Sequence, residues 1–284
     1  MRSIRVLLVC VLCLLAGRSL AAPEAALVMD GRTGAVLLAE NADTPLHPAS
    51  LTKMMTLWIA FDMVERGAIH VDAMLEVSAK AAAEPGSRLG LREGSRISVR
   101  HLIRAVAVKS ANDAATALAE ALSGSEAAFV ARMNATAAAM GLSGTAFRNA
   151  HGLTEAGHRS TARDMSVLGR RLRWDFPGYW NLFSRRTADA GLRRVAHTNR
   201  RFLGAYAGAD GIKTGYTRAA GFNLTASARR GERWLIVTVF GQSSSAARAA
   251  RVARLMDRGF ARVPETLAPV PPPPLAREAP APET

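Results

Sequence analysis

Strand-like patterns at the two ends of this chain enclose a middle that is almost entirely helical. Short apolar runs over 25–30 and 35–39 flank turn residues, which predicts a hairpin. Three more strands are expected over 212–217, 222–229 and 234–240. Strands from both ends must pair to bury their apolar faces. The pattern therefore predicts an α/β (α+β) fold, with one mixed antiparallel sheet built from both termini, flanked by helices, and a helical lobe.

Apolar residues at helical spacing predict the helices of this lobe. They are expected over 50–66, 99–108, 113–122, 126–140 and 161–174, and an amphipathic helix over 244–258 follows the last strand. The first of these helices should have a buried body, because residues such as Met54, Leu57 and Phe61 recur along it. Its first residue, Ser50, is expected where the lobe meets the sheet.

Residues 1–22 have the pattern of a secretory signal peptide. Arg2 and Arg5 precede an apolar run over 6–16, and small residues follow over 19–22. The run is too short to span a bilayer, so cleavage is expected, after Ala22 or alternatively after Ala21. We therefore predict an exported, periplasmic protein that is soluble after cleavage.

The cysteine positions restrict the chemistry of the mature chain. Cys10 and Cys13, the two cysteines of the sequence, both lie in the predicted signal peptide. The mature chain would have no disulfide, no cysteine nucleophile and no cysteine-ligated metal. The histidines show no metal-ligand spacing, and we predict neither a metal nor another cofactor.

The end of the chain differs in composition from the rest. Residues 264–284 are rich in proline and are expected to form a disordered tail. The tail has no amphipathic face, so no stable membrane anchor is predicted. This leaves 23–263 as the one folded domain.

The basic residues are unevenly divided between arginine and lysine. The formal net charge is +14, yet only four of the 37 basic residues are lysines: Lys53, Lys80, Lys109 and Lys213. No interleaved aromatic platform or nucleic-acid motif accompanies the charge, so no nucleic-acid partner is predicted. A lysine can lose its proton when it is desolvated or lies near another cation, whereas arginine cannot. The lysines are therefore the candidates for proton transfer.

Ser50 and Lys53 form the first candidate pair. Residues i and i+3 share one face of a helix, so the amine can reach the hydroxyl. A helix N-terminus also offers free N–H groups near Ser50. The pattern S-x-x-K alone occurs by chance roughly once in a chain of this length, where it is a helix cap followed by a surface lysine.

Two further motifs extend this pair to a candidate active site. Ser110-Ala111-Asn112 lies between two predicted helices, and Lys213-Thr214-Gly215 lies on a predicted strand. Separately, these read as a helix cap and as an edge-strand charge beside a glycine. All three in this order, in an exported chain, are expected by coincidence in about one chain in a hundred.

The motif set is that of penicillin-binding proteins and class A β-lactamases. From about Ala25 to Arg262, the chain resembles the low-molecular-mass penicillin-binding proteins that are serine-type D-alanyl-D-alanine carboxypeptidases. The resemblance also runs through the segments 41–43, 48–53, 147–153, 161–165, 198–200 and 221–224. It implies the serine β-lactamase/transpeptidase-like fold, peptidoglycan stem peptides ending in D-Ala-D-Ala as substrates, and β-lactam antibiotics as covalent inhibitors.

The resemblance also implies catalytic roles. Ser50 would attack the carbonyl between the two D-alanines, with Lys53 as the base and Ser110 relaying a proton to the leaving amine. Backbone N–H groups of Ser50 and Tyr216 would form the oxyanion hole.

The remaining roles concern substrate binding. Asn112 would hold the substrate amide, and Lys213, Thr214 and Gly215 would bind beside the terminal carboxylate. Arg248 is the more distant cation expected there. His151 is expected to shape the loop beneath the site rather than to transfer protons.

Three alternatives remain open. A β-lactamase shares Ser50, Lys53 and Lys213, but class A members usually have Ser-Asp-Asn and a glutamate that activates water. Here the second motif is Ser-Ala-Asn, and Glu155, the acidic residue nearest the expected place, lacks the matching context. A DD-endopeptidase would use the same machinery. An idle peptidoglycan-binding scaffold is disfavoured because Ser50 and Lys53 are both present.

Overall fold

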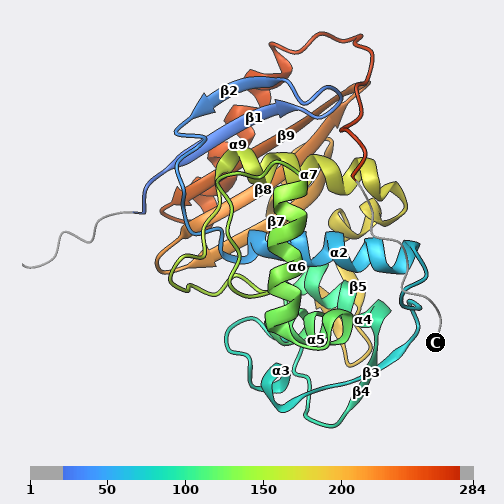
Figure 1. Ribbon diagram of the computed structural model, residues 1–284. Coiled ribbons are helices and arrows are strands. Elements are labelled where there is room, and N and C mark those ends of the chain that lie inside the picture. Colours follow the sequence, from blue (N-terminus) through green and yellow to red (C-terminus); the bar gives the residue numbers. More distant parts are fainter. Residues whose placement is uncertain (1–21, 276–284) are drawn as a thin grey trace, which may run out of the picture.

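The computed structural model describes residues 22–275, and one five-stranded sheet dominates its upper part in Figure 1. The strand order is β2-β1-β9-β8-β7, and every neighbouring pair is antiparallel. The strands are β1 (Ala25–Asp30), β2 (Val36–Glu40), β7 (Ala209–Thr217), β8 (Gly221–Arg230) and β9 (Arg233–Gln242). The β1–β9 pairing joins the two ends of the chain, which confirms the predicted origin of the sheet.

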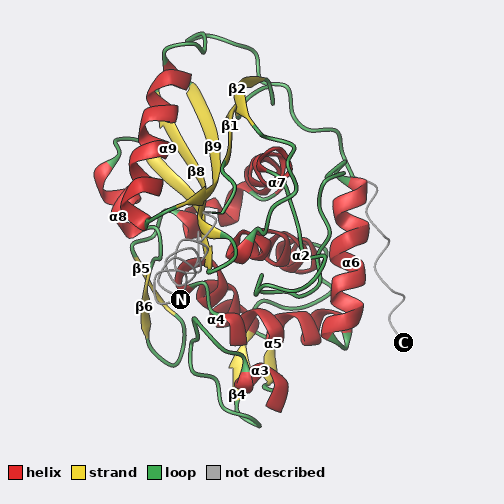
Figure 2. Ribbon diagram, turned by 90° about the vertical axis from the view of Figure 1, so that its left-hand side faces the viewer, coloured by secondary structure: helices red, strands yellow, loops and turns green. Residues whose placement is uncertain are grey.

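Helices cover both faces of this sheet (Figures 1 and 2). α9 (Ser245–Phe260) packs on one face and α7 (Ala162–Asp175) on the other. The strand residues alternate accordingly, as strand geometry requires. In β1, Val28 belongs to the cluster of buried residues that includes α9, whereas Leu27 belongs to the larger cluster that includes α7 and the helical lobe.

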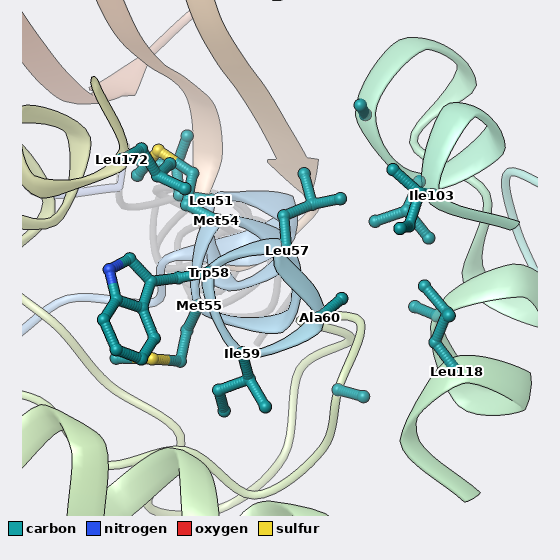
Figure 3. Packing of buried hydrophobic residues seen from close by; sticks show 14 of the residues in the cluster. Leu51, Met54, Met55, Leu57, Trp58, Ile59, Ala60, Ile103, Leu118 and Leu172 are labelled. Atoms are coloured by element: carbon teal, nitrogen blue, oxygen red, sulfur yellow. The ribbon is translucent and has the colours of Figure 1, made fainter. Parts of the chain in front are cut away.

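The helical lobe is built around α2 (Lys53–Glu65), whose first ten residues are all buried. Apolar side chains leave this helix in every direction, which is typical of a helix enclosed by others. Figure 3 shows Leu57, Ile59 and Ala60 around it, with Ile103 and Leu118 on the neighbouring helices. The other elements of the lobe are η1 (Ala49–Thr52), α3 (Ala79–Ala83), α4 (Val99–Arg104), η2 (Ala105–Lys109), α5 (Asn112–Ser123) and α6 (Glu126–Ala139). Of these, η1, η2, α5 and α6 contact α2, as does α7.

The long elements follow the sequence prediction, and the short ones do not. The predicted helix over 99–108 is divided into α4 and the wide turn η2, and the helix expected from Ser50 begins with the tight turn η1. The unpredicted elements are β3 (Met74–Glu76), α3 (Ala79–Ala83), β4 (Arg96–Ser98), η3 (Pro177–Phe183), β5 (Thr187–Asp189), β6 (Arg194–Ala196) and α8 (Arg200–Ala205). Elements this short carry too few residues to show a period.

The proline-rich tail differs from the expectation of disorder. Residues 264–275 lie against the domain, where the Val270 N–H donates to Arg32 O at 3.0 Å. Arg170 donates to Val270 O and Arg171 to Pro273 O. Leu275 packs against the large hydrophobic cluster. Extended proline-rich backbone leaves its carbonyls free, and buried arginines donate hydrogen bonds to them here. The rest of the predicted tail, 276–284, lies outside the described residues.

The predicted signal peptide falls almost wholly outside the described part of the chain, which begins at Ala22. Within residues 22–275, no helix combines the length and the hydropathy needed to cross a membrane.

Candidate active site

Ser50 lies in η1, and Lys53 opens α2 directly after it. Lys53 Nζ lies 3.1 Å from Ser50 Oγ, as the i, i+3 spacing predicts. The same amine donates to Asn112 Oδ1 at 2.7 Å and to the carbonyl oxygen of His151 at 2.6 Å. Because the lysine is fully buried, these groups fix its amine beside the serine hydroxyl.

The environment of Lys53 favours its neutral form. Burial lowers the pKa of Lys53 well below its usual range, and the positive charge of Lys213 lowers it further. The carboxylates of Glu84 and Asp113 act in the opposite direction. A lysine with a lowered pKa can accept a proton from a neighbouring hydroxyl near neutral pH.

Ser110 and Asn112 stand at the junction between η2 and α5. Ser110 has a φ of 62°, in the left-handed region, which costs a non-glycine residue of order 1 kcal/mol. Asn112 is held by its backbone N–H, which donates to Ser87 O at 2.7 Å, and by its side-chain amide, which donates to Pro85 O at 2.6 Å. The amide oxygen is thereby turned toward Lys53.

Lys213 brings the edge strand β7 to the same place. Its Nζ donates to Ser110 Oγ at 2.7 Å, and the neighbouring Thr214 Oγ1 donates to Thr198 Oγ1 at 2.8 Å. Burial, followed by the charge of Arg248, lowers the pKa of Lys213 to about 7. The second lysine of the site therefore titrates in the neutral range.

Gly215 allows β7 to approach η1 closely. A Cβ atom added at Gly215 would lie 2.8 Å from Pro48 O and 3.1 Å from the backbone nitrogen of Ser50. Real Cβ atoms essentially never make contacts below 3.0 Å. The glycine of the third motif is thus required by contact with the backbone that carries the first motif.

A cleft of about 430 Å³ opens over these groups. It is lined by seven of the predicted site residues: Ser50, Ser110, Asn112, Thr214, Gly215, Tyr216 and Arg248. The other two, Lys53 and Lys213, are buried and reach the lining serines from beneath. All nine candidates therefore converge on one site.

The cleft also has lining residues that the sequence did not assign to it. These are Gly86, Ser87, Gly152, Leu153, Thr198, Thr217, Phe222 and Ser245. Four of them, Gly152, Leu153, Thr198 and Phe222, occur in segments that carry the family resemblance. That resemblance is the sequence feature that could have identified them. The others lie outside every motif, and only the folded chain brings them here.

Arg248 and Tyr216 form one end of the cleft. Arg248 is 9% exposed, and its guanidinium carbon lies 6.0 Å from the centre of the Phe222 ring. Burial lowers the pKa of Arg248 to about 10, so it keeps its charge at neutral pH. Tyr216 is 56% exposed, with its ring centre 4.3 Å from that of Phe222. A cation therefore lies beside an aromatic pair at the cleft mouth.

Glu155, His158 and His197 do not line the cleft. Glu155 accepts a hydrogen bond from Asn149. Burial lowers the pKa values of His158 and His197 to about 3, so both are neutral.

One group of potential metal ligands occurs in the described part of the chain: Glu84, Glu126 and His151, with donor atoms within 4.8 Å of one another. Lys80 Nζ already lies 2.7 Å from Glu126 Oε2. A protein cation thus neutralises one carboxylate, and we assign no metal to the group.

Comparison with known proteins agrees with this geometry. The sequence model of the peptidase S11 family, described as D-alanyl-D-alanine carboxypeptidase, matches residues 16–244. The chain is 37% identical over 244 residues to the D-alanyl-D-alanine carboxypeptidase DacF of Bacillus subtilis, covering 84% of this chain and 62% of DacF. It is 37% identical over 252 residues to DacC of Escherichia coli, covering 87% of this chain and 63% of DacC. It thus spans less than two thirds of these relatives.

Solved structures agree with the fold. Penicillin-binding protein 5 from Haemophilus influenzae superposes with a TM-score of 0.81 at 33% identity, covering 87% of this chain and 73% of that chain. Penicillin-binding protein D2 from Listeria monocytogenes, in an ampicillin-bound form, gives 0.76 at 32% identity, covering 83% of this chain and 96% of that chain. Together with the convergence of the three motifs on one cleft, these matches show that the chain belongs to the D-alanyl-D-alanine carboxypeptidase family, peptidase S11.

Proposed function

We propose that this chain is a serine DD-carboxypeptidase, which removes the terminal D-alanine from peptidoglycan pentapeptide stems through an acyl-enzyme on Ser50. The observation that carries the proposal is the contact between Ser50 Oγ and the buried amine of Lys53. A serine is a weak nucleophile unless a base removes its proton. The lowered pKa of Lys53 allows its amine to be that base without help from a histidine.

In the acylation step, Ser50 Oγ attacks the carbonyl carbon of the penultimate D-alanine while its proton passes to Lys53 Nζ. The oxyanion that forms would be stabilised by the N–H groups of Ser50 and Tyr216. The close approach of Gly215 to the backbone of Ser50 supports this assignment, since it brings β7 to the serine. β7 is also an edge strand, and such edges can pair with an extended peptide.

The next steps release the product. Ser110 would pass a proton to the leaving amine of the terminal D-alanine, and Lys213, 2.7 Å from Ser110 Oγ, would support that transfer. Water then hydrolyses the ester on Ser50, with Lys53 again as the base. The substrate's terminal carboxylate would be held by Lys213, Thr214 and Arg248, the first and last of which are buried cations of the site.

Acylation by β-lactams is part of the proposal, because the Listeria protein binds ampicillin in its solved structure. A β-lactamase reading is disfavoured by the position of Glu155, which does not line the cleft. A DD-endopeptidase would cut a crosslinked stem through the same steps.

The test is the release of D-alanine from a pentapeptide ending in D-Ala-D-Ala, with Ser50→Ala as the control. Release by the wild type alone supports the carboxypeptidase. Cleavage of crosslinked dimers without release from the pentapeptide would favour the endopeptidase. Rapid penicillin hydrolysis without D-alanine release would favour the β-lactamase and contradict the proposal.

We also propose export to the periplasm, supported by the signal-peptide pattern of residues 1–22. When the full-length sequence is expressed, osmotic shock should release a chain whose N-terminal residue is Pro23. Recovery of uncleaved chain in washed membranes would contradict this.

A further inference from the structure

Three buried side chains meet beside the loop that supports Lys53. Glu84 follows α3, Glu126 is the first residue of α6, and His151 belongs to the loop before α7. Their exposures are 8%, 8% and 6%. His151 Nε2 lies 3.4 Å from Glu84 Oε2 and 3.7 Å from Glu126 Oε1. One imidazole ring thus stands between two carboxylates from different elements.

The hydrogen bonds of the ring indicate which nitrogen holds its proton. His151 Nδ1 accepts from the backbone N–H of Leu153 at 3.2 Å. In a neutral imidazole whose Nδ1 accepts, the proton is on Nε2, which here faces the carboxylates. This ring orientation therefore suits a pair of negative neighbours.

The carboxylates are themselves tied to the surrounding elements. Glu126 Oε1 accepts from the Ala150 N–H at 3.0 Å, and its Oε2 lies 2.7 Å from Lys80 Nζ. Glu84 Oε1 accepts from Thr116 Oγ1 at 3.0 Å. Buried carboxylates with such partners form a rigid support rather than a solvated patch.

The loop that these groups hold is the one that contacts the catalytic pair. The carbonyl oxygen of His151 accepts from Lys53 Nζ at 2.6 Å, and that of Ala150 accepts from Thr56 Oγ1 at 2.6 Å. At Gly152, an added Cβ atom would lie 1.9 Å from Ala49 O. A displacement of the loop would therefore move one of the hydrogen-bond partners of the Lys53 amine.

Charges reach Lys53 from several elements. Lys213 faces it from β7, Asp113 from α5 and Glu84 from the segment after α3. Glu84 is the larger of the two negative influences that raise the pKa of Lys53. The carboxylate of Asp113 is already bound by backbone N–H groups, including those of Leu89 and Gly90.

We propose that Glu84, Glu126 and His151 are positioning residues, which hold the His151 carbonyl against Lys53 Nζ and supply, through Glu84, negative charge near the catalytic amine. This rests on the proposed function, because it assumes that Lys53 is the base for Ser50. The triad has no role in the chemistry of the substrate itself, since none of its side chains lines the cleft. Its effect reaches the reaction through Lys53.

The test follows the acylation rate by benzylpenicillin against pH in the full-length enzyme. Glu84→Gln keeps the shape and a hydrogen bond to Thr116 but removes the charge, so the pKa of Lys53 falls. Because Lys53 must be unprotonated to act, the acid limb of the profile should move to lower pH by about 0.5 to 1 unit. Glu120→Gln is the matched control, because Glu120 bonds Ser78 and does not touch the loop.

Two Glu126 variants test the holding role. Glu126→Ala removes the acceptor for the Ala150 N–H and should lower the plateau acylation rate about tenfold. Glu126→Gln retains an acceptor oxygen and should restore most of the rate. Thermal unfolding of each variant checks that it is folded.

The outcomes separate the two proposals. If the wild type is not acylated, the proposed function fails. If the wild type is acylated but Glu84→Gln leaves the acid limb in place or moves it to higher pH, the positioning role of Glu84 is wrong. A folded Glu126→Ala with the wild-type plateau would contradict the role of Glu126.

Discussion

Lys213 Nζ donates a hydrogen bond of 2.7 Å to Ser110 Oγ and so joins the edge strand of the sheet to the helical lobe. The sheet and the lobe each supply one lysine to the candidate site, and both lysines are fully buried. The positive charge of Lys213 contributes to the lowered pKa of Lys53, after burial.

The rate of the enzyme should fall on both sides of neutral pH. As the pH rises through about 7, Lys213 loses its proton and the site loses a cation that binds the substrate carboxylate, so KM should rise. As the pH falls through the lowered pKa of Lys53, the base gains a proton and kcat/KM should fall. Steady-state kinetics between about pH 5 and 9 measure both limbs. A KM that stays constant above pH 7 would refute the assignment to Lys213.

Replacing Lys53 should slow acylation strongly without unfolding the chain. Lys53→Met preserves much of the side-chain volume but cannot accept a proton, so the acylation rate should fall by about 10²–10⁴-fold. Stopped-flow measurement with a fluorescent penicillin gives this rate. Lys109→Met, at a lysine outside the site, provides the control and should acylate normally. Near-normal acylation of Lys53→Met would mean that another group removes the proton.

Gly215→Ala should separate the strand from the serine. Its added Cβ atom would meet Pro48 O at 2.8 Å, which forces β7 or η1 to move. Misplacement of catalytic groups by about 1 Å can cost on the order of 10²-fold in rate. The control is Gly178→Ala, where an added Cβ atom meets nothing within 4 Å. An unchanged acylation rate for Gly215→Ala would show that the close approach is not needed.

The docked part of the tail should stabilise the domain. A chain ending at Val263 loses the carbonyls that bind Arg170 and Arg171 and should unfold at a lower temperature than the full chain. A loss of about 1–3 kcal/mol corresponds to roughly 3–10 °C in a domain of this size. A chain ending at Leu275 keeps these contacts and should match the full chain in Tm. Equal Tm values for all three chains would show that the tail contributes nothing.

The parts of the site that follow from local rules could be predicted from sequence. Lys53 reaches Ser50 because helical spacing fixes their relative position, and the long strands and helices show clear periods. The resemblance to a known family then joined Ser110 and Lys213 to the same site. Periodicity alone could not have paired them, because tertiary packing brings Lys213 of β7 to Ser110, which follows η2.

Other features depend on contacts that no local pattern records. Glu84 and Glu126 lie outside every motif and reach His151 only when three elements fold together. The tail was expected to be disordered because its composition is typical of linkers. Residues 264–275 are instead held by Arg170 and Arg171 of α7 and by Arg32 in the turn after β1. No sequence pattern indicates that these arginines bind the backbone of the tail.

The most direct test of the central claim is to locate the acyl group after brief treatment with benzylpenicillin. We expect intact-protein mass spectrometry to show one adduct, and peptide mapping to place it on Ser50. Ser50→Ala should show none. An adduct on another serine, or an equal adduct on Ser50→Ala, would contradict Ser50 as the nucleophile.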